Sequence, residues 1–304
     1  MITVVFATFN GSHTLPRMLA SLRNLEPVAE GLQIIAVDNG SDDDSVSILN
    51  GYVDHLPIKI LSQPVRGKNR ALNMALSHIQ GDLTVFTDDD VIADPAWVRS
   101  LVRCAADHPE VDLFGGAIQP HWESSPPGWL SDAIPMGVTY ALTDPELTAG
   151  PISAHLIWGP NMMVRTALFR AGHRFNEKIG PSSGQYVMGS ETEFNSRMHA
   201  LGHRTYFCPD ARVAHIIRPA QLAPSWMIKR GYRYGKNEYI RNLNKPGVGG
   251  TPPSVPRWMY RQLAENLMRG YMARFLGHEG NAVKHLWNAE FIKGYIAQAK
   301  ASRE

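Results

Sequence analysis

Four apolar segments, separated by stretches of a different periodicity, constrain most strongly how this chain folds. They are rich in β-branched side chains and occupy residues 2–9, 32–37, 58–61 and 83–87. Near-continuous apolar runs of this kind are typical of parallel strands buried on both faces. Apolar residues at helical spacing predict helices over 15–22, 68–78 and 97–106. This alternation predicts an α/β fold, with a mostly parallel sheet and helices on both of its faces.

Three of the predicted strands run directly into polar residues. Thr8 and Asn10 close the first strand, Asp38 follows the second, and three consecutive aspartates follow the fourth. In an open parallel sheet, ligands bind beyond the carboxyl ends of the strands. Ordinary turns and helix caps explain one such cluster. Three clusters in register favour a ligand site at this edge of the sheet.

The three consecutive aspartates, Asp88, Asp89 and Asp90, are the sharpest chemical feature of the sequence. Adjacent carboxylates repel one another, and a divalent cation relieves that repulsion most simply. Carboxylate oxygens are hard ligands that suit Mg²⁺ or Mn²⁺. We therefore expect a metal site here, with a solvated acidic turn as the alternative.

The composition is that of a globular protein with a buried core. Of the 304 residues, 44% are hydrophobic and 19% are charged. Apolar runs stay shorter than the roughly 18 residues of a membrane span, and we expect no signal peptide. Cys104 and Cys208 are too few for a disulfide framework or a cysteine-ligated zinc site. These features predict a cytoplasmic protein in a reducing compartment.

Less periodic segments predict loops and short helices. A helix is expected to begin at Asp42, because acidic residues suit a helix N-terminus. Residues 115–155 carry many Pro, Gly and Ser and predict an irregular excursion. A Gly- and Ser-rich loop is expected over 180–190, followed by a helix from about Glu191. A loop is also expected over 244–256, inside a helical C-terminal region.

Charge is distributed unevenly along the chain, although the formal net charge is only +2. Residues 1–217 have a balance of −8 and residues 218–304 a balance of +10. Arginines there accompany apolar residues that recur at helical spacing between 260 and 275. One interpretation is a helix packed on the main domain. The other is an interfacial helix that meets an anionic membrane surface.

Six short motifs, in order, resemble those of the family 2 glycosyltransferases with the GT-A fold. They are ATFNG (7–11), VDNGSDD (37–43), GKNRALN (67–73), TDDDVIADP (87–95), GPNMMVR (159–165) and GSETEF (189–194), and His215 completes the set. The resemblance covers about residues 2–218. It implies a GT-A type, Rossmann-like domain over 1–218, which leaves a basic, mainly helical region over 219–304.

The resemblance also implies where a nucleotide-diphosphate sugar would bind. Asp38 would contact the nucleobase, and UDP-sugars are the expected donors. The other implied donor-side contacts are Thr8 and Asn10 in the nucleotide pocket, Asp88 toward the ribose and metal, Asp90 on the metal, His215 as a further metal ligand, and Lys68 and Arg70 near the diphosphate. Two cations in a helix's first turn oppose its dipole, so an anionic ligand explains Lys68 and Arg70 better than helix stability does. A solvated helix face is the alternative.

On the acceptor side, the resemblance gives Glu191 the position of the catalytic base. The family has an adjacent Glu-Asp pair there, whereas this chain has Ser190 and Glu191, so Glu193 is the reserve candidate. On one helix the two glutamates would face about 200° apart and would not share a site. Trp158, Asn161 and Glu193 are the expected residues of an acceptor or sugar pocket, with a place in the apolar core as the alternative for Trp158.

Together these features predict an inverting, metal-dependent glycosyltransferase. The expected acceptor is a hydroxyl of a saccharide or lipid-linked glycan in surface polysaccharide synthesis, with no nucleic acid involved. An anionic membrane surface is a further expected partner, which would make the protein peripheral on the inner face of the membrane. The alternatives are a sugar-phosphate nucleotidyltransferase, which would need a basic Gly-rich loop after the first strand, and a non-catalytic nucleotide-sugar-binding module.

Overall fold

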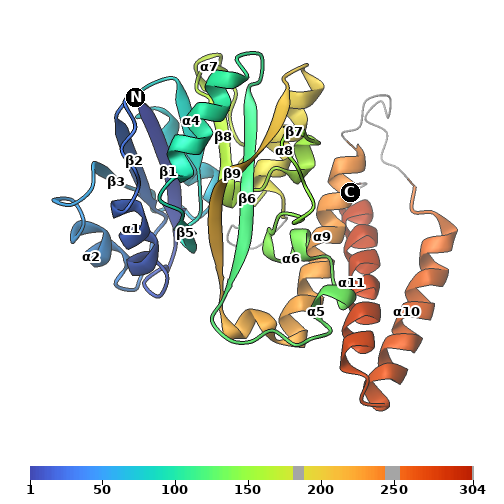
Figure 1. Cartoon of the computed structure of the whole chain (residues 1–304). Coiled ribbons are helices and arrows are strands. Elements are labelled where there is room, and N and C mark those ends of the chain that lie inside the picture. The colour runs from blue at the N-terminus through green and yellow to red at the C-terminus, as the bar shows by residue number, and fades with distance from the viewer. Residues whose placement is uncertain (181–187, 244–253, 303–304) are drawn as a thin grey trace. The chain divides into compact units, whose positions relative to one another are not determined.

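The computed structural model describes residues 1–180, 188–243 and 254–302, and its contacts divide them into two units (Figure 1). The first unit comprises Met1–His121, 141–180 and Ser190–Ile216. The second comprises Trp122–Tyr140, 188–189 and the described residues from Ile217 onward. The second unit therefore draws on a segment before residue 141 as well as on the basic C-terminal region.

The first unit is built on one sheet, whose nine strands within the described residues follow the order β3-β2-β1-β4-β8-β6-β9-β5, with β7 paired to β9. Parallel pairing joins β3, β2, β1 and β4. Antiparallel pairing joins β4 to β8, β8 to β6 and β9 to both β5 and β7. The strands are β1 (Ile2–Thr8), β2 (Leu32–Asp38), β3 (Ile58–Ser62), β4 (Leu83–Phe86), β5 (Val91–Ala93), β6 (Leu113–Trp122), β7 (Gly150–Pro151), β8 (Met162–Arg165) and β9 (Thr205–Ile217).

Helices cover both faces of this sheet, as expected (Figure 1). They are α1 (Leu15–Arg23), α2 (Ser45–Asn50), α3 (Lys68–Leu76), α4 (Trp97–Asp107), α7 (Ala167–Arg170) and α8 (Ser190–Ala200), with 3₁₀ turns η1 (Ala154–Leu156) and η2 (Gly159–Asn161). The apolar strands predicted from the sequence agree with β1 to β4 to within one residue at each end. The near-continuous apolar runs and their β-branched residues were therefore sufficient to locate these four strands.

An aromatic cluster fixes three elements that carry polar residues at their ends. Phe86 of β4 lies 5.1 Å from Phe175, and Phe175 lies 4.7 Å from Phe194 of α8, between ring centroids. Ala71 and Leu72 of α3 are buried in the same cluster. The apolar core thereby sets the positions of the first turns of α3 and α8 and of the residues that follow β4.

Three helices dominate the second unit, with α11 packed against both α9 and α10 (Figure 1). Its helices are α5 (Leu130–Ala133), α6 (Met136–Tyr140), η3 (Pro219–Leu222), α9 (Pro224–Leu243), α10 (Arg257–Phe275) and α11 (Glu279–Ala301). Glycines let α9 and α11 approach closely: a Cβ at Gly294 would collide with the backbone carbonyl of Tyr232. Among the residues that the structure describes, no helix has the length and apolarity to cross a bilayer.

Two local expectations are wrong. The helix expected from Asp42 begins at Ser45 instead, because the Asp43 carboxylate accepts hydrogen bonds from the Ser12 and Ser45 amides and so forms a turn. The segment 115–155 is not wholly irregular, because β6 continues to Trp122 and short helices follow it. Most of the two expected loops, 181–187 and 244–253, lies outside the described residues.

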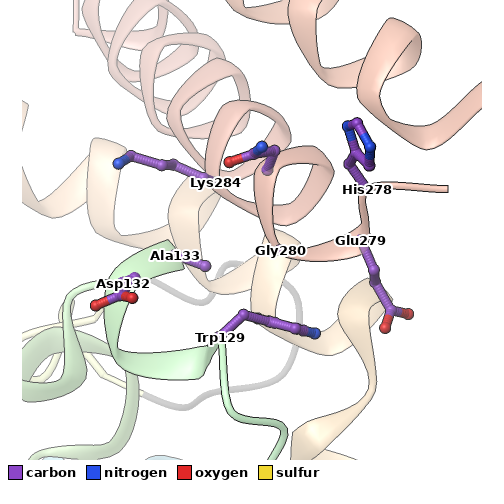
Figure 2. A pocket seen from close by; sticks show the side chains of 8 residues that line it. Trp129, Asp132, Ala133, His278, Glu279, Gly280 and Lys284 are labelled. Atoms are coloured by element: carbon purple, nitrogen blue, oxygen red, sulfur yellow. The ribbon is translucent and has the colours of Figure 1, made fainter. Parts of the chain in front are cut away.

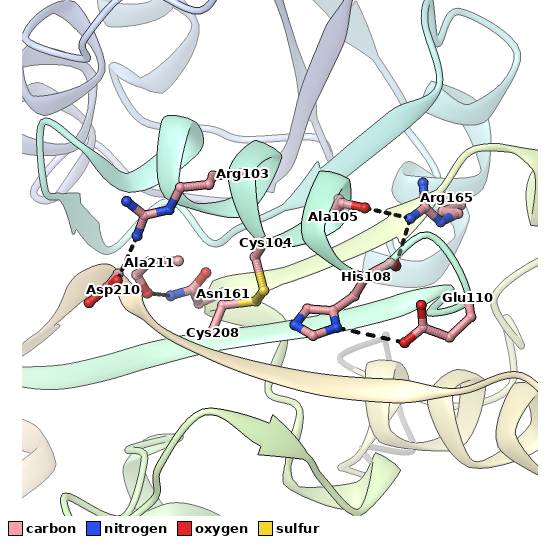
Figure 3. The surroundings of a disulfide bond; sticks show 10 residues. All are labelled: Arg103, Cys104, Ala105, His108, Glu110, Asn161, Arg165, Cys208, Asp210 and Ala211. Carbon is pink, nitrogen blue, oxygen red and sulfur yellow. Dashed lines mark hydrogen bonds and ion pairs between the residues drawn. A yellow bond between two sulfur atoms is a disulfide. The ribbon is translucent and has the colours of Figure 1, made fainter.

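The two cysteines form a disulfide, which corrects the expectation drawn from their small number (Figure 3). Cys104 of α4 bonds to Cys208 of β9 across 104 residues of sequence. A count of two cysteines says nothing about distance in space, and the sheet brings this pair together. The bond lies beside the buried side chain of Asn161 and ties α4 to the strand that carries His215 (Figure 3).

We expect Gly294→Ala to lower the thermal midpoint of unfolding, because the new methyl group forces α9 and α11 apart. Overpacking of this kind costs about 1–3 kcal/mol. Gly128→Ala is the matched control, since a Cβ there has nothing within 4 Å. Differential scanning calorimetry of both variants tests the packing, and equal midpoints would contradict it.

We expect the non-reduced, denatured protein to contain no titratable thiol and the reduced protein to contain two. A Cys104→Ala/Cys208→Ala variant should lose about 2–5 kcal/mol of stability, because the bond closes a long loop of the unfolded chain. Thiol titration and urea unfolding measure both effects. Alkylation of both cysteines without reductant would show that the bond is absent.

Candidate active site

The carboxyl ends of the parallel strands bring the sequence-predicted polar residues to one edge of the sheet. Thr8 pairs in register with Asp38, and Asp38 with Ser62. Phe86, which ends β4, pairs with Val5 of β1, so the aspartates that follow it continue toward the same edge. The parallel register thus places the ends of three strands, and the loops after them, in one neighbourhood.

Lys68 connects two carboxylates that come from distant parts of the sequence. Its Nζ lies 2.6 Å from Oδ1 of Asp88 and 2.6 Å from Oε1 of Glu191. The three side chains are only 13–24% exposed. Burial alone would lower the pKa of Lys68, but the charges of Asp88 and Glu191 outweigh it and raise that pKa above its usual value. A permanent ammonium therefore holds the two carboxylates in one cluster.

Asp89 occupies a different environment from its two neighbours. Burial and the negative charge of Asp90 raise the pKa of Asp89 to about 7. Its Oδ2 accepts a hydrogen bond of 2.5 Å from the Thr8 hydroxyl. Thr8, predicted as a nucleotide contact, is thus engaged with the central aspartate of the triplet.

Asp90 and His215 provide one oxygen and one nitrogen donor side by side. His215 Nε2 lies 3.2 Å from Asp90 Oδ1, and both side chains are less than a fifth exposed. Pairing of β5 with β9 sets Val91 opposite His215, and the Ile216 amide donates to the Asp90 carbonyl. This backbone pairing, which the sequence does not reveal, explains how residues 125 positions apart meet.

These donors suit Mn²⁺, which accepts imidazole beside carboxylate oxygen. Asp88 also lies two residues from Asp90, although its carboxylate is paired with Lys68. Within the described part of the chain, no three His, Cys, Asp or Glu side chains converge in a metal-binding arrangement. The donor chemistry therefore fits a cation that takes its remaining ligands from outside these side chains.

Glu191 and Glu193 point to different partners, as expected from their helical spacing. Glu191 contacts Lys68, whereas Glu193 pairs with Arg197 one turn along α8, with 2.9 Å between Oε1 and Nε. Gly159 makes room for Glu191, because a Cβ there would lie 2.5 Å from its Cδ. The half-buried Trp158 precedes that glycine. Only Glu191 of the two therefore belongs to the Lys68 cluster.

Several predicted residues have other partners. Arg70 pairs with Glu177 at 3.0 Å, with both side chains about two-fifths exposed. Asp38 accepts hydrogen bonds from the Gly40 and Ser41 amides. Asn10, in the left-handed conformation with φ 53°, accepts from the Asp42 amide.

Asn161 is not a pocket residue, which corrects its assignment to an acceptor or sugar site. It is fully buried, and its side-chain amide accepts a hydrogen bond from Trp97 Nε1 and donates one to the carbonyl of Ala117. The amide also donates to the carbonyl of Ala211 (Figure 3). All of its hydrogen-bonding capacity serves the interior of the first unit. The motif GPNMMVR marked a structurally important residue here and gave no information about which way its side chain points.

The sequence analysis missed one residue that shapes this edge. Asn39 is buried and donates to the carbonyls of Gln63 and Val65, and its own Oδ1 accepts from the Gly67 amide. It thereby orders the loop that leads into α3 and Lys68. The sequence signal that could have identified Asn39 is its position directly after Asp38 in the motif VDNGS.

A separate pocket of about 470 Å³ lies in the second unit, between α5 and the first turn of α11 (Figure 2). It is lined by Trp129, Asp132, Ala133, His278, Glu279, Gly280, Asn281 and Lys284. Gly280 allows close packing, because a Cβ there would lie 2.8 Å from Trp129 Cβ. None of the residues predicted to bind a donor lines this pocket.

The motifs and the geometry of this edge agree with a comparison against known protein families. The family model described as glycosyl transferase family 2 matches residues 3–172, more than half of the chain. The chain belongs to glycosyl transferase family 2. It is therefore a glycosyltransferase, and the alternatives of a nucleotidyltransferase and a non-catalytic module are not supported.

Curated relatives are distant but span most of the chain. The succinoglycan biosynthesis protein ExoM of Rhizobium meliloti is 25% identical over 227 residues, which are 73% of this chain and 70% of that protein. A glucosyl-dolichyl phosphate glucuronosyltransferase of Haloferax volcanii is 20% identical over 226 residues, 71% of this chain and 69% of that protein.

Solved structures share the fold over nearly the whole chain. The mannosyltransferase PcManGT of Pyrobaculum calidifontis, in complex with GDP-Man and Mn²⁺, aligns with TM-score 0.60 and 17% identity over 99% of this chain and 75% of that one. S. aureus TarS 1-349 with UDP aligns with TM-score 0.56 and 16% identity over 99% of this chain and 91% of that one. The expected GT-A architecture is confirmed.

We expect Lys68→Met to destabilise the first unit, because Asp88 and Glu191 lose their shared counter-ion. Removing one partner of a buried pair costs about 3–5 kcal/mol, and the partial exposure here predicts the lower end. Adding Glu191→Gln should recover part of the loss, since the double variant carries one fewer unpaired charge. Urea unfolding of the wild type, both single variants and the double variant measures this coupling. Strictly additive effects would show that the Lys68–Glu191 pair is absent in solution.

Proposed function

We propose that this enzyme transfers a sugar, with inversion at the anomeric carbon, from a nucleoside-diphosphate donor to an acceptor hydroxyl. The observation that carries the proposal is the pairing of Lys68 with both Asp88 and Glu191. Of the two carboxylates that Lys68 contacts, Asp88 belongs to the aspartate triplet and Glu191 is the expected base. A donor diphosphate and an acceptor hydroxyl would therefore meet at one cluster.

The donor end of the site would use residues at the carboxyl ends of β1 and β2. We assign Asp38 to the nucleobase and Thr8 and Asn10 to the nucleotide pocket, with Asp88 near the ribose. Binding beyond strand ends is the general rule for sheets of this type. The solved neighbours are complexes with GDP-Man and Mn²⁺ (PcManGT) and with UDP or UDP-GlcNAc (TarS). A UDP-sugar is the donor that we propose to test first.

Asp90 and His215 would hold a divalent metal, with Asp88 close to it. Support comes from their 3.2 Å separation and from their mixed oxygen and nitrogen character. When bound, such a cation supplies Lewis acidity toward a phosphate oxygen. Mn²⁺ is our first choice and Mg²⁺ the second.

Two residues of the chain would accept the acceptor proton and stabilise the charge on the leaving group. The acceptor oxygen attacks the anomeric carbon, and the bond from that carbon to the oxygen of the β-phosphate breaks. Glu191 takes the proton of the acceptor hydroxyl as the acceptor oxygen bonds to the anomeric carbon. Lys68 stabilises the negative charge that develops on the leaving diphosphate. One displacement by an external hydroxyl inverts the anomeric centre.

Glycan biosynthesis is the proposed setting. The names of the two curated relatives refer to succinoglycan biosynthesis and to a glucosyl-dolichyl phosphate substrate. A saccharide hydroxyl on a lipid-linked acceptor is consistent with both. Half-buried Trp158 precedes Gly159, which lies against Glu191, and it is the residue that we propose to face the acceptor or donor sugar.

We expect Glu191→Gln to lower the rate of nucleoside diphosphate release about 10²–10⁴-fold, because the amide cannot accept the hydroxyl proton. Glu193→Gln is the matched control on the same helix turn, since Glu193 pairs with Arg197. The assay supplies UDP-, GDP- and dTDP-sugars with Mn²⁺ and a saccharide acceptor panel. Normal turnover by Glu191→Gln together with loss of turnover in Glu193→Gln would identify Glu193 as the base.

A further inference from the structure

The helix α10 exposes an unusual number of large apolar side chains. At least half of the surface of each is accessible, and Phe275 is 90% exposed. The set comprises Trp258, Tyr260, Met268, Tyr271, Met272 and Phe275, with Leu276 directly after the helix. Single exposed apolar residues are ordinary, but Met268, Tyr271, Met272 and Phe275 lie within about 100° of one another around the helix axis, and an exposed apolar group of this kind marks an interaction surface.

The buried side of α10 packs against α11. Met259, Gly270 and Ala273 are buried there, and Leu263 packs against the apolar cluster that Met259 forms with residues of α11. At about 100° per residue, Met268 and Phe275 lie on the opposite side from Gly270 and Ala273. A helix that is apolar on both sides needs a second apolar environment. Packing within the second unit therefore leaves the exposed face of α10 without an explanation.

Positive charge accompanies this face. The helix carries four arginines and one acidic residue, and that residue, Glu265, pairs with Arg261 at 2.8 Å. The other three arginines are Arg257, Arg269 and Arg274, and all three are exposed. Tyrosine and tryptophan prefer the boundary between water and lipid, and arginine attracts anionic headgroups. The exposed aromatic residues and the arginines of α10 both suit the surface of an anionic lipid bilayer.

We propose that the exposed face of α10 binds the surface of an anionic lipid bilayer. Met268, Met272 and Phe275 would enter the acyl boundary, while the arginines meet headgroup phosphates. A second copy of the same face is a poorer partner, because a two-fold interface would bring like charges together. This proposal does not depend on the proposed function, but it would bring the enzyme to a lipid-linked acceptor.

Vesicle binding by the full-length chain tests the proposal. Sedimentation with vesicles of phosphatidylglycerol and phosphatidylcholine is compared with sedimentation with phosphatidylcholine alone. We expect binding to the anionic vesicles that weakens as salt rises from low to physiological ionic strength. The vesicle assay contains no sugar nucleotide and does not measure sugar transfer. A lack of vesicle binding therefore would not contradict the proposed transfer reaction, and a lack of transfer activity would not contradict vesicle binding.

Two variants separate the apolar and the electrostatic parts. Met272→Gln/Phe275→Gln should weaken vesicle binding at least about tenfold, because two side chains no longer enter the lipid. Val53→Gln/Leu201→Gln is the matched control, since both residues are exposed in the first unit. Arg257→Gln/Arg269→Gln/Arg274→Gln should weaken binding on the order of a hundredfold at low salt. Unchanged thermal midpoints establish that each variant is folded.

Three results would overturn the proposal. The first is equal vesicle binding by the wild type and the α10 apolar variant, and the second is no wild-type binding at low salt. The third is a dimer in light scattering that the α10 apolar variant converts to a monomer, which would identify the face as a contact between copies. Loss of binding in the α10 variants alone, with a wild-type monomer, supports it.

Discussion

Neutralisation of carboxylates by Lys68 is the interaction on which the rest of the site depends. Asp88, Glu191 and Asp90 bring several negative charges to one partly buried neighbourhood, where burial and the charges of Glu191 and Asp90 raise the pKa of Asp88. The Lys68 ammonium, 2.6 Å from two of them, offsets that repulsion. A diphosphate or a cation that enters this neighbourhood changes the charge around both carboxylates. Under the proposed function, the donor diphosphate and the base Glu191 would therefore share Lys68 as a counter-ion.

The fold supplies this neighbourhood from rigid elements. Lys68 and Glu191 both stand in first turns of helices that the same aromatic and aliphatic cluster buries. The aspartates follow a strand whose last residue, Phe86, belongs to that cluster. His215 is positioned by strand pairing, and the Cys104–Cys208 disulfide ties its strand to α4. The polar residues of the candidate site thus lie at the ends of helices and strands, and the buried interiors of these elements fix their positions.

Sequence patterns predicted the local elements well and the long-range pairings poorly. The apolar period located β1 to β4, and the motif order led to the correct family. The direction of individual side chains was not encoded in either signal: Asn161 turned inward to bond Trp97, and Arg70 turned to Glu177. The disulfide and the Asp90–His215 contact depend on β9, whose pairings join distant segments. Such contacts follow from topology, which residue periodicity does not specify.

Titration calorimetry of Mn²⁺ and a nucleoside diphosphate is the most direct measurement of the central claim. The account predicts that each ligand binds more tightly in the presence of the other, by about 5–150-fold, because Asp90 and the diphosphate share the cation. Asp90→Asn should abolish this coupling while the protein stays folded. Independent binding of the two ligands, or no detectable binding of either at saturating concentrations, would contradict the account.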